Sequence, residues 1–329
     1  MSSVFSDQLR KWGPEALESR RTTVAEAEAY CRRLACTHYE NFPVVTWLLP
    51  RKRRQHFYNV YAYCRWADDL GDEVAGNEES LALLGWWRNE LSACYAGAAR
   101  HPVFVALRNT IEEFGIPSQP FADLITAFEQ DQRVSEYETF PQLLEYCRFS
   151  ANPVGRLVLY LSGAYGERNV DWSDSICTGL QLANFWQDVS RDMDIGRVYL
   201  PLEDLAQFGY SREALAARET NQAFIELMRF EVGRAREFLC RGLPLAAQMP
   251  GRLQVDIELF ALGGLKILER IESIGYRVWE TRPVVSKRDV AVLFAGSLFR
   301  AVRRRLPFCR GRKQLGSNPR RMCHDDIAR

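Results

Sequence analysis

Apolar residues recur with a helical period along almost every long segment of this 329-residue chain. Residues three and four positions apart lie on one face of a helix, so the pattern predicts helices that each bury one side. We find no segment with sustained alternation of period two between hairpin turns, and no succession of strand and helix units. The sequence therefore predicts an all-α fold and argues against a parallel sheet that binds a dinucleotide.

The predicted helices follow one another with breaks at glycine, asparagine and proline. Their approximate bounds are 24–36, 51–74, 78–99, 102–114, 117–133, 140–149, 153–165, 173–193, 221–248, 253–279 and 286–304. No repeat, low-complexity segment or linker divides the chain before residue 300. We expect an N-terminal segment at 1–20, a single helical domain over 21–305, and a basic, disordered tail over 306–329.

The net charge of +1 gives no general case for a nucleic-acid partner. Charge is concentrated at the C-terminal end, where Arg300 to Arg329 holds ten arginines and lysines against two aspartates. A basic segment on an otherwise acidic chain predicts a peripheral contact with an anionic membrane surface, and the alternative is a solvated tail. The apolar stretch from Val290 to Val302 is too short to span a bilayer. We interpret it as a core helix, with a helix lying on a membrane surface as the alternative.

The nine cysteines include no Cys-x-x-Cys pair and no zinc spacing. The N-terminus has no apolar region of the secretory type. These features predict a cytoplasmic protein, with any membrane contact peripheral and at the inner face.

The first cluster of charged residues comprises Tyr61, Arg65, Asp68, Asp69 and Asp72, whose spacing places them on one face of a helix. The rest of that helix is largely apolar, and carboxylates there are costly unless a cation neutralises them. Carboxylates one turn apart suit Mg²⁺, which prefers oxygen ligands and bridges to substrate phosphates. The alternative is a solvated acidic face on which Arg65 pairs with Asp69.

The second cluster is Asn184, Asp188 and Asp192, spaced four residues apart, with Gln181 one turn earlier. An amide oxygen and two carboxylates form a plausible half-site for Mg²⁺. Arg197, in the loop that follows, could donate charge-assisted hydrogen bonds to a diphosphate. The alternative is a polar stripe beside solvent.

The two clusters together are more specific than either one. They lie about 120 residues apart in the sequence and can face each other across a helical bundle. A diphosphate held between them by Mg²⁺ would leave as its charge is stabilised, and the resulting carbocation would need a dry cavity. The pair therefore predicts metal-assisted ionisation of a diphosphate ester.

These residues resemble the squalene and phytoene synthase family, which joins isoprenyl diphosphates head to head. The resemblance covers about residues 36–300 and rests on Tyr61-Ala-Tyr-Cys-Arg65, on Asp68-Asp69-Leu-Gly-Asp72-Glu73 and on Asn184-x3-Asp188-x3-Asp192. It implies a single-domain, isoprenoid synthase-type helical bundle with a central cavity. It also implies two or three Mg²⁺ ions bound with the diphosphate, and their ligands would be Asp68, Asp69, Asp72, Asn184, Asp188 and Asp192.

The same resemblance assigns the remaining site residues. The catalytic residues would be Tyr146, Asp68, Asp72, Asp188 and Asp192. The substrate-binding residues would be Arg54, Tyr61, Arg65, Asn152, Gln181 and Arg197. Asn152 and Pro153 read as an N-cap and a first helical residue, which predicts a helix break lining the cavity.

Three departures from the family pattern bear on the reaction. The segment His38-Tyr-Glu-Asn-Phe-Pro43 lacks the basic residue that helps related synthases to bind a diphosphate. Ser150-Ala-Asn-Pro-Val-Gly155 replaces the family's Val-Ala-Gly-x-Val-Gly stretch, and Gly263-Gly264 stands where related synthases carry a tyrosine. The variants resemble the hopanoid-pathway branch that forms hydroxysqualene.

This branch implies that presqualene diphosphate and water give hydroxysqualene and diphosphate, without NADPH. Other hopanoid-pathway enzymes would make the substrate and reduce the product. Two alternatives stay open. One is a presqualene diphosphate or squalene synthase that condenses two molecules of farnesyl diphosphate. The other is a non-catalytic helical membrane adaptor that retains the fold.

Overall fold

The computed structural model describes residues 3–16, 21–38 and 51–305. Within these ranges all regular elements are helices, and extended chain pairs only at an isolated bridge between Glu136 and Val198. The predicted all-α fold is confirmed. The chain divides into two compact units, Met1–Val170 with Gly196–Leu202 and Asp171–Ile195 with Glu203–Arg329. The expectation of one domain over 21–305 stays a prediction.

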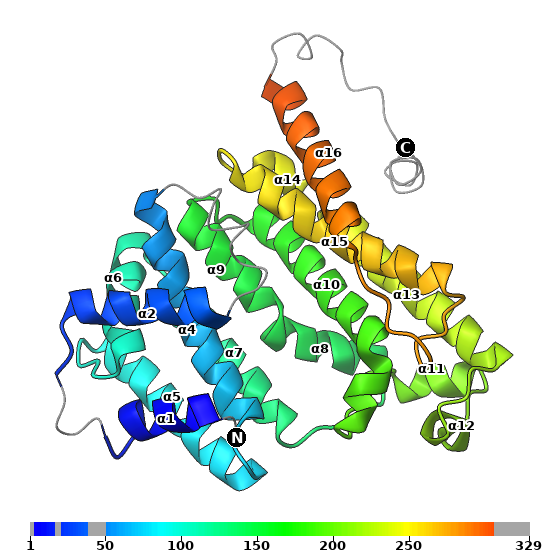
Figure 1. Ribbon diagram of the computed structural model, residues 1–329, viewed down its shortest axis with the longest axis horizontal. Coiled ribbons are helices and arrows are strands. Elements are labelled where there is room, and N and C mark those ends of the chain that lie inside the picture. Colours follow the sequence, from blue (N-terminus) through cyan, green and yellow to red (C-terminus); the bar gives the residue numbers. More distant parts are fainter. Residues whose placement is uncertain (1–2, 17–20, 39–50, 306–329) are drawn as a thin grey trace. The chain divides into compact units, whose positions relative to one another are not determined.

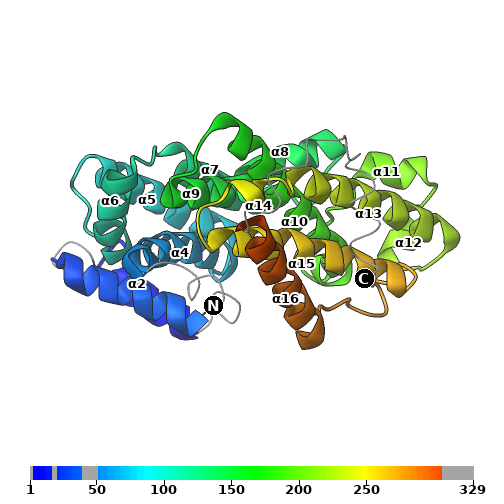
Figure 2. The ribbon, with the colours of Figure 1, turned by 90° about the horizontal axis from the view of Figure 1, so that it is seen from above.

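The first unit is built around α4, which packs against α2, α5, α6 and α7 (Figures 1 and 2). Its helices are α1 (Ser3–Trp12), α2 (Val24–His38), α4 (Arg51–Asp72), α5 (Asn77–Tyr95), α6 (Pro102–Phe114), α7 (Gln119–Asp131), α8 (Phe140–Ser150) and α9 (Asn152–Ser162). Asn59 of α4 is fully buried and donates hydrogen bonds to Ala106 O and Thr110 Oγ1, each at 3.0 Å. These bonds fix the register of α4 on α6, because an unpaired buried amide is costly.

Aromatic side chains fill the core of this unit on the inner face of α4. Trp66 stacks on Trp87 of α5 with ring centroids 5.4 Å apart, and the buried His101 meets Trp66 edge-on at 4.5 Å. Burial holds the pKa of His101 well below its usual range, and its Nδ1 accepts the Val103 amide hydrogen that begins α6. His101 is therefore a neutral helix cap within the core. The packing orients the opposite face of α4 away from the core.

The second unit contains residues 171–194 of α10 (Glu167–Asp194) and the helices that follow. These are α11 (Leu202–Gln207), α12 (Arg212–Ala216), α13 (Gln222–Gly242), α14 (Leu245–Gln248), α15 (Leu253–Ser273) and α16 (Lys287–Arg305). Glycines let the three long helices approach closely. A Cβ on Gly179 of α10 would lie 2.9 Å from the backbone nitrogen of Leu239, and one on Gly264 of α15 would lie 2.8 Å from Leu180 Cδ2.

Most predicted helix bounds agree with the structure to within a few residues. The segment 221–248, which was predicted to form one helix, forms two. Helix α13 ends at Gly242 and α14 begins at Leu245, and Pro244 lies in the break between them. The helix predicted over 253–279 ends at Ser273, and Gly275 follows with a φ of 65°. The segment expected at 1–20 contains α1, which the sequence analysis did not predict.

The prediction that residues 290–302 form a core helix is wrong about burial. This stretch lies in α16, where Val292 and Phe299 are 68% and 67% exposed. They are therefore outside the contact between α16 and α15, the helix on which α16 packs. In the part of the chain that the structure describes, no helix is both long and apolar enough to cross a membrane.

Candidate active site

The outward face of α4 carries the first carboxylate cluster. Asp68 and Asp72 lie one turn apart on it, and their side chains are 42% and 53% exposed. The surrounding protein and then the nearby charge of Asp72 raise the pKa of Asp68 to about 7. Repulsion between two carboxylates on a partly desolvated surface is relieved by a shared cation.

Asp69 has a different environment from its neighbour Asp68. Its side chain is 9% exposed and forms an ion pair with Arg65, which also contacts Asp68 Oδ2 at 3.2 Å. The pairing that the sequence analysis gave as an alternative is present, but it engages the buried Asp69 and leaves Asp68 and Asp72 accessible. Asp68 and Asp72 are therefore the stronger ligand candidates on this face.

Arg197 approaches this cluster from a segment distant in sequence. Its Nη2 lies 3.4 Å from Asp72 Oδ1. The segment is held against the first unit by hydrogen bonds from Val198 N to Ser135 O at 2.7 Å and from Leu202 N to Tyr137 O at 3.0 Å. The predicted diphosphate-binding arginine is thereby placed beside the predicted metal ligand.

Asp131, the last residue of α7, is not among the site residues predicted from the sequence. Tyr146 donates a hydrogen bond to the Asp131 carboxylate, and the charges of Arg197 and Asp72 are close enough to affect it. Burial raises the pKa of Asp131 to about 6, against the opposing effect of Arg197. Burial also raises the pKa of Tyr146 well above its usual range, so its hydroxyl stays protonated. Asp131 links the predicted catalytic tyrosine to the predicted diphosphate arginine.

Tyr146 is one of three tyrosines whose rings lie together beside Asp131. The rings of Tyr137 and Tyr199 stack with centroids 5.9 Å apart, and Tyr146 stacks on Tyr199 at 6.0 Å. All three are buried. They form an aromatic wall beside the Asp131 carboxylate, in which the rings stack on one another.

The second carboxylate cluster lies on α10, in the other unit. Asn184 is exposed and donates from Nδ2 to Asp188 Oδ2 at 3.1 Å, which leaves its amide oxygen for a cation. The backbone at Asp188 departs from helical geometry, with φ −107° and ψ 15°, so α10 is kinked there. Asp192 follows the kink, and the three positions do not lie on one straight helical face as the spacing predicted.

Arg282 is a second residue that the sequence analysis missed. It lies between α15 and α16 and binds both oxygens of Asp188, from Nε to Oδ1 at 2.5 Å and from Nη2 to Oδ2 at 2.9 Å. The neighbouring Pro283 O accepts a hydrogen bond from the buried Gln187 at 2.5 Å. A carboxylate has about four lone-pair positions, so the two bonds from Arg282 and the one from Asn184 leave Asp188 one position for a cation.

The structure also describes the remaining residues that were predicted to bind substrate. Arg54 and Tyr61 lie on the same face of α4 as Arg65, three turns and one turn before it. Gln181 is half-buried on α10. Asn152 is buried, and it is the first helical residue of α9 with Ala151 as the N-cap, so the predicted capping role is wrong by one position. The helix break between α8 and α9 is confirmed, and the His38–Pro43 motif lies outside the described residues apart from the end of α2.

Both clusters fit Mg²⁺ by the chemistry of their donors. Their candidate ligands are carboxylate and amide oxygens, and Mg²⁺ ordinarily completes its shell with water and substrate phosphate oxygens. Among the described residues, no three histidine, cysteine, aspartate or glutamate side chains gather into a group able to hold a metal by themselves. The assignments of Asp68, Asp72, Asn184, Asp188 and Asp192 as ligands stay predictions.

Comparison with known proteins identifies the class to which this fold and these clusters belong. The family model for squalene/phytoene synthase matches residues 36–289. The chain belongs to the squalene/phytoene synthase family, whose members process isoprenyl diphosphates.

Within that family the chain is similar to proteins of more than one activity. Its sequence is 43% identical to that of squalene synthase HpnC from Alicyclobacillus acidocaldarius. The crystal structure of that protein matches this structure with a TM-score of 0.74 over 77% of this chain and 95% of that one. It is 33% identical to the phytoene synthase of Arthrospira platensis over 80% of this chain and 91% of the relative. It is 32% identical to the hydroxysqualene synthase of Rhodopseudomonas palustris over 76% of this chain and 82% of the relative.

Proposed function

We propose that the chain converts presqualene diphosphate and water into hydroxysqualene and diphosphate. The observation that carries the proposal is the environment of Asp68 and Asp72, two accessible carboxylates on one helix face with Arg197 beside them. Such a face suits a diphosphate bound through Mg²⁺ with a guanidinium alongside. The resemblance to the family assigns further ligands to Asn184, Asp188 and Asp192, and the proposal includes this assignment.

The reaction exchanges the ester C–O bond for a C–O bond to water, and the carbon skeleton rearranges between these two steps. The ester C–O bond would break and its electron pair would leave with the diphosphate, whose growing charge Arg197 would neutralise. Asp68 and Asp72 would hold the Mg²⁺, which would supply further stabilisation of that charge. The cation rearranges beside the tyrosine wall of Tyr137, Tyr146 and Tyr199, and the oxygen of water then bonds to carbon and loses a proton. No electrons are gained, so the reaction needs no NADPH.

Two considerations favour this reaction over chain joining. Two relatives named hydroxysqualene synthase are 32% identical to this chain. The His38–Pro43 segment also lacks a basic residue, as expected of an enzyme that accepts one diphosphate substrate rather than two. Enzymes that make presqualene diphosphate and that reduce an allylic alcohol would act before and after this one.

A second candidate is the head-to-head condensation of two isoprenyl diphosphates. It is favoured by the phytoene synthases of Arthrospira platensis and a Synechocystis strain, which are 33% and 32% identical to this chain. The same metal face would serve that reaction, because it begins with the same loss of diphosphate.

The test supplies purified full-length protein and Mg²⁺ with presqualene, farnesyl or geranylgeranyl diphosphate, with and without NADPH. We expect hydroxysqualene from presqualene diphosphate alone, identified by mass, and equal yield without NADPH. A C30 or C40 condensation product from the shorter substrates would establish the second candidate instead. The absence of Mg²⁺-dependent diphosphate release from every substrate would leave only the non-catalytic adaptor.

A further inference from the structure

The last helix, α16, presents several large apolar side chains to solvent. Val292, Leu298 and Phe299 are 68%, 47% and 67% exposed, and Ala291 and Ala295 are exposed between them. Positions 291, 292, 295, 298 and 299 fall on one arc of a helix. We call these five residues the outer face of α16. It is a continuous apolar stripe rather than a scatter of single residues, and stripes of this kind mark interaction surfaces.

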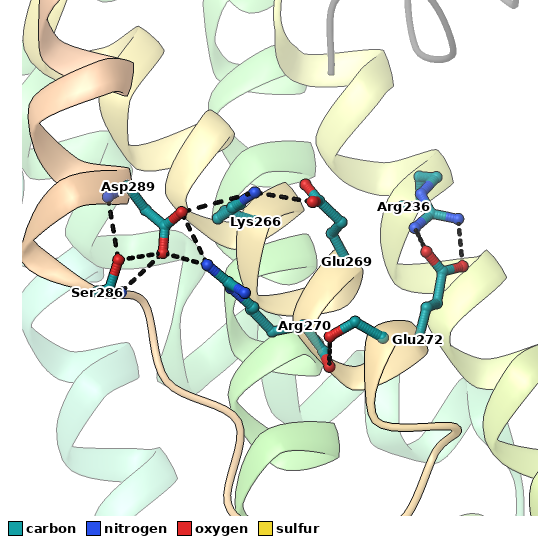
Figure 3. Close-up of polar contacts among 8 residues, drawn as sticks. Arg236, Lys266, Glu269, Arg270, Glu272, Ser286 and Asp289 are labelled. Atoms are coloured by element: carbon teal, nitrogen blue, oxygen red, sulfur yellow. Dashed lines mark hydrogen bonds and ion pairs between the residues drawn. The ribbon is translucent and has the colours of Figure 1, made fainter. Parts of the chain in front are cut away.

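Polar contacts occupy the side of α16 that meets α15. Asp289 accepts hydrogen bonds from Arg270 Nη2 at 2.7 and 2.9 Å and lies 3.7 Å from Lys266 Nζ (Figure 3). Near the other end, Arg300 Nε donates to the buried Glu258 Oε1 at 3.0 Å. These ion pairs hold α16 with its charged side inward, which is the reverse of an ordinary surface helix. The orientation of the outer face is therefore fixed by contacts within the unit.

Positive charge borders the outer face. Lys287 and Arg288 are exposed in the first turn of α16, and the sequence from Arg300 to Arg329 holds ten basic residues against two aspartates. An apolar stripe that begins beside the exposed Lys287 and Arg288 is complementary to a bilayer surface that contains anionic lipids, and the basic composition of the sequence after Arg300 favours the same partner. Two copies of this face would carry charge of the same sign, which opposes self-association.

We propose that the outer face of α16 docks the protein on the surface of an anionic lipid bilayer, with the apolar side chains among the acyl chains and the basic residues among the headgroups. The helix lies along the surface and does not cross it. A consequence that rests on the proposed function is that hydroxysqualene, which has lost its charged group, leaves directly into the lipid phase.

The test measures co-sedimentation of the full-length protein with vesicles, without substrate. One vesicle preparation contains phosphatidylcholine with phosphatidylglycerol, and the other contains phosphatidylcholine alone. The variant is Val292→Ser with Phe299→Ser, and the matched control is Val24→Ser, an exposed valine on α2. Thermal unfolding establishes that all three proteins are folded, and turnover with detergent-dispersed substrate reports the active site separately.

We expect the unaltered protein and the Val24→Ser variant to bind the anionic vesicles and to bind pure phosphatidylcholine more weakly. The double variant should lose at least about tenfold in partition coefficient, because burial of even one large apolar side chain is worth about that much. Its turnover in detergent should be unchanged. Binding of the double variant equal to the original would overturn the proposal, as would no binding by the original protein. A dimer that the double substitution splits, without any vesicle binding, would assign the face to self-association.

Discussion

Asp68 and Asp69 are neighbouring carboxylates with opposite surroundings. Asp69 is buried against Arg65, whereas Asp68 is accessible beside Asp72. A removed carboxylate therefore has a different consequence at each position. Loss of the Asp68 carboxylate removes a candidate metal ligand. Loss of the Asp69 carboxylate leaves the partly buried guanidinium of Arg65 without its closest partner.

Asp68→Asn should lower Mg²⁺-dependent diphosphate release at least about 100-fold without lowering the melting temperature. Asp69→Asn should reduce the free energy of unfolding by about 1–3 kcal/mol, because Arg65 loses a charged partner. Turnover and thermal unfolding, measured on both variants, separate the two roles. Near-normal release by Asp68→Asn would contradict its assignment as a ligand.

Asp131 offers a second test at this scale. Asp131→Asn keeps an oxygen that can accept the Tyr146 hydrogen bond but removes the negative charge near Arg197. We expect kcat to fall about 10- to 100-fold, as when a residue that positions another is changed. The loss should be accompanied by weaker inhibition by inorganic diphosphate, which reports a displaced Arg197. An unchanged diphosphate inhibition constant would show that Asp131 does not position Arg197.

Glu231 and Asp204 form a buried acidic pair in the second unit. Arg234 Nη1 lies 2.6 Å from Asp204 Oδ2 and 3.0 Å from Glu231 Oε1, and no hydrogen bond reaches Glu231 Oε2. Burial, opposed by Arg234 and reinforced by Asp204, raises the pKa of Glu231 from 4.5 to about 9. Two carboxylates thus share one guanidinium, and a proton on Glu231 makes it a donor to Asp204.

The raised pKa makes stability depend on pH in a defined direction. The folded state holds the Glu231 proton more tightly than the unfolded chain, so this contribution is complete below pH 4.5 and is lost as the pH rises to about 9. Glu231→Gln imitates the protonated acid. At pH 8 we expect it to raise the free energy of unfolding by about 1–3 kcal/mol and to flatten the profile between pH 5 and about 9. Urea unfolding across that range measures the free energy of unfolding of both proteins. A Glu231→Gln profile that runs parallel to that of the original protein, at lower stability, would refute the shared proton.

At the scale of helices, close packing depends on glycine at particular positions. Gly179→Ala should destabilise the protein by about 1–3 kcal/mol, because the new Cβ meets the backbone of Leu239. Gly233 of α13 has nothing within 4 Å of a Cβ, so Gly233→Ala should stabilise by about 0.5–1 kcal/mol through helix propensity. Equal effects of the two substitutions in chemical unfolding would contradict this account of the packing.

Local signals explain which elements could be predicted from the sequence. The bounds of α6 follow from Pro102 at its start and Gly115 after its end, and both residues act within one turn. The kink at Asp188 has no such signal, because no proline or glycine stands there. Asp131 interacts with Tyr146 and Arg197, and Asp188 binds Arg282. These partners lie on other segments of the chain. The candidate ligands could therefore be predicted from spacing, whereas the arginine and tyrosine contacts around them required the fold.

For the whole molecule, the resemblance to the family predicts that the candidate ligands on α4 and on α10 bind the same diphosphate, and thermal unfolding tests this prediction. Mg²⁺ and inorganic diphosphate together should raise the melting temperature by several degrees, and neither alone should do so. Asp68→Asn and Asp188→Asn should each abolish this increase, and the double variant should be no worse than either one. An increase that halves with each substitution and disappears only in the double variant would indicate two independent anion sites.

The hydrogen bonds of Val198 and Leu202 to the loop around Tyr137 also bear on how the protein is made. Residues 196–202 complete the first unit, yet in the chain they follow residues 171–195 of the second. A ribosome must therefore synthesise all of α10 before Arg197 can reach Asp72. The first 170 residues alone lack part of the first unit, and a gene divided at that point would encode a fragment without the arginine at its own carboxylate face.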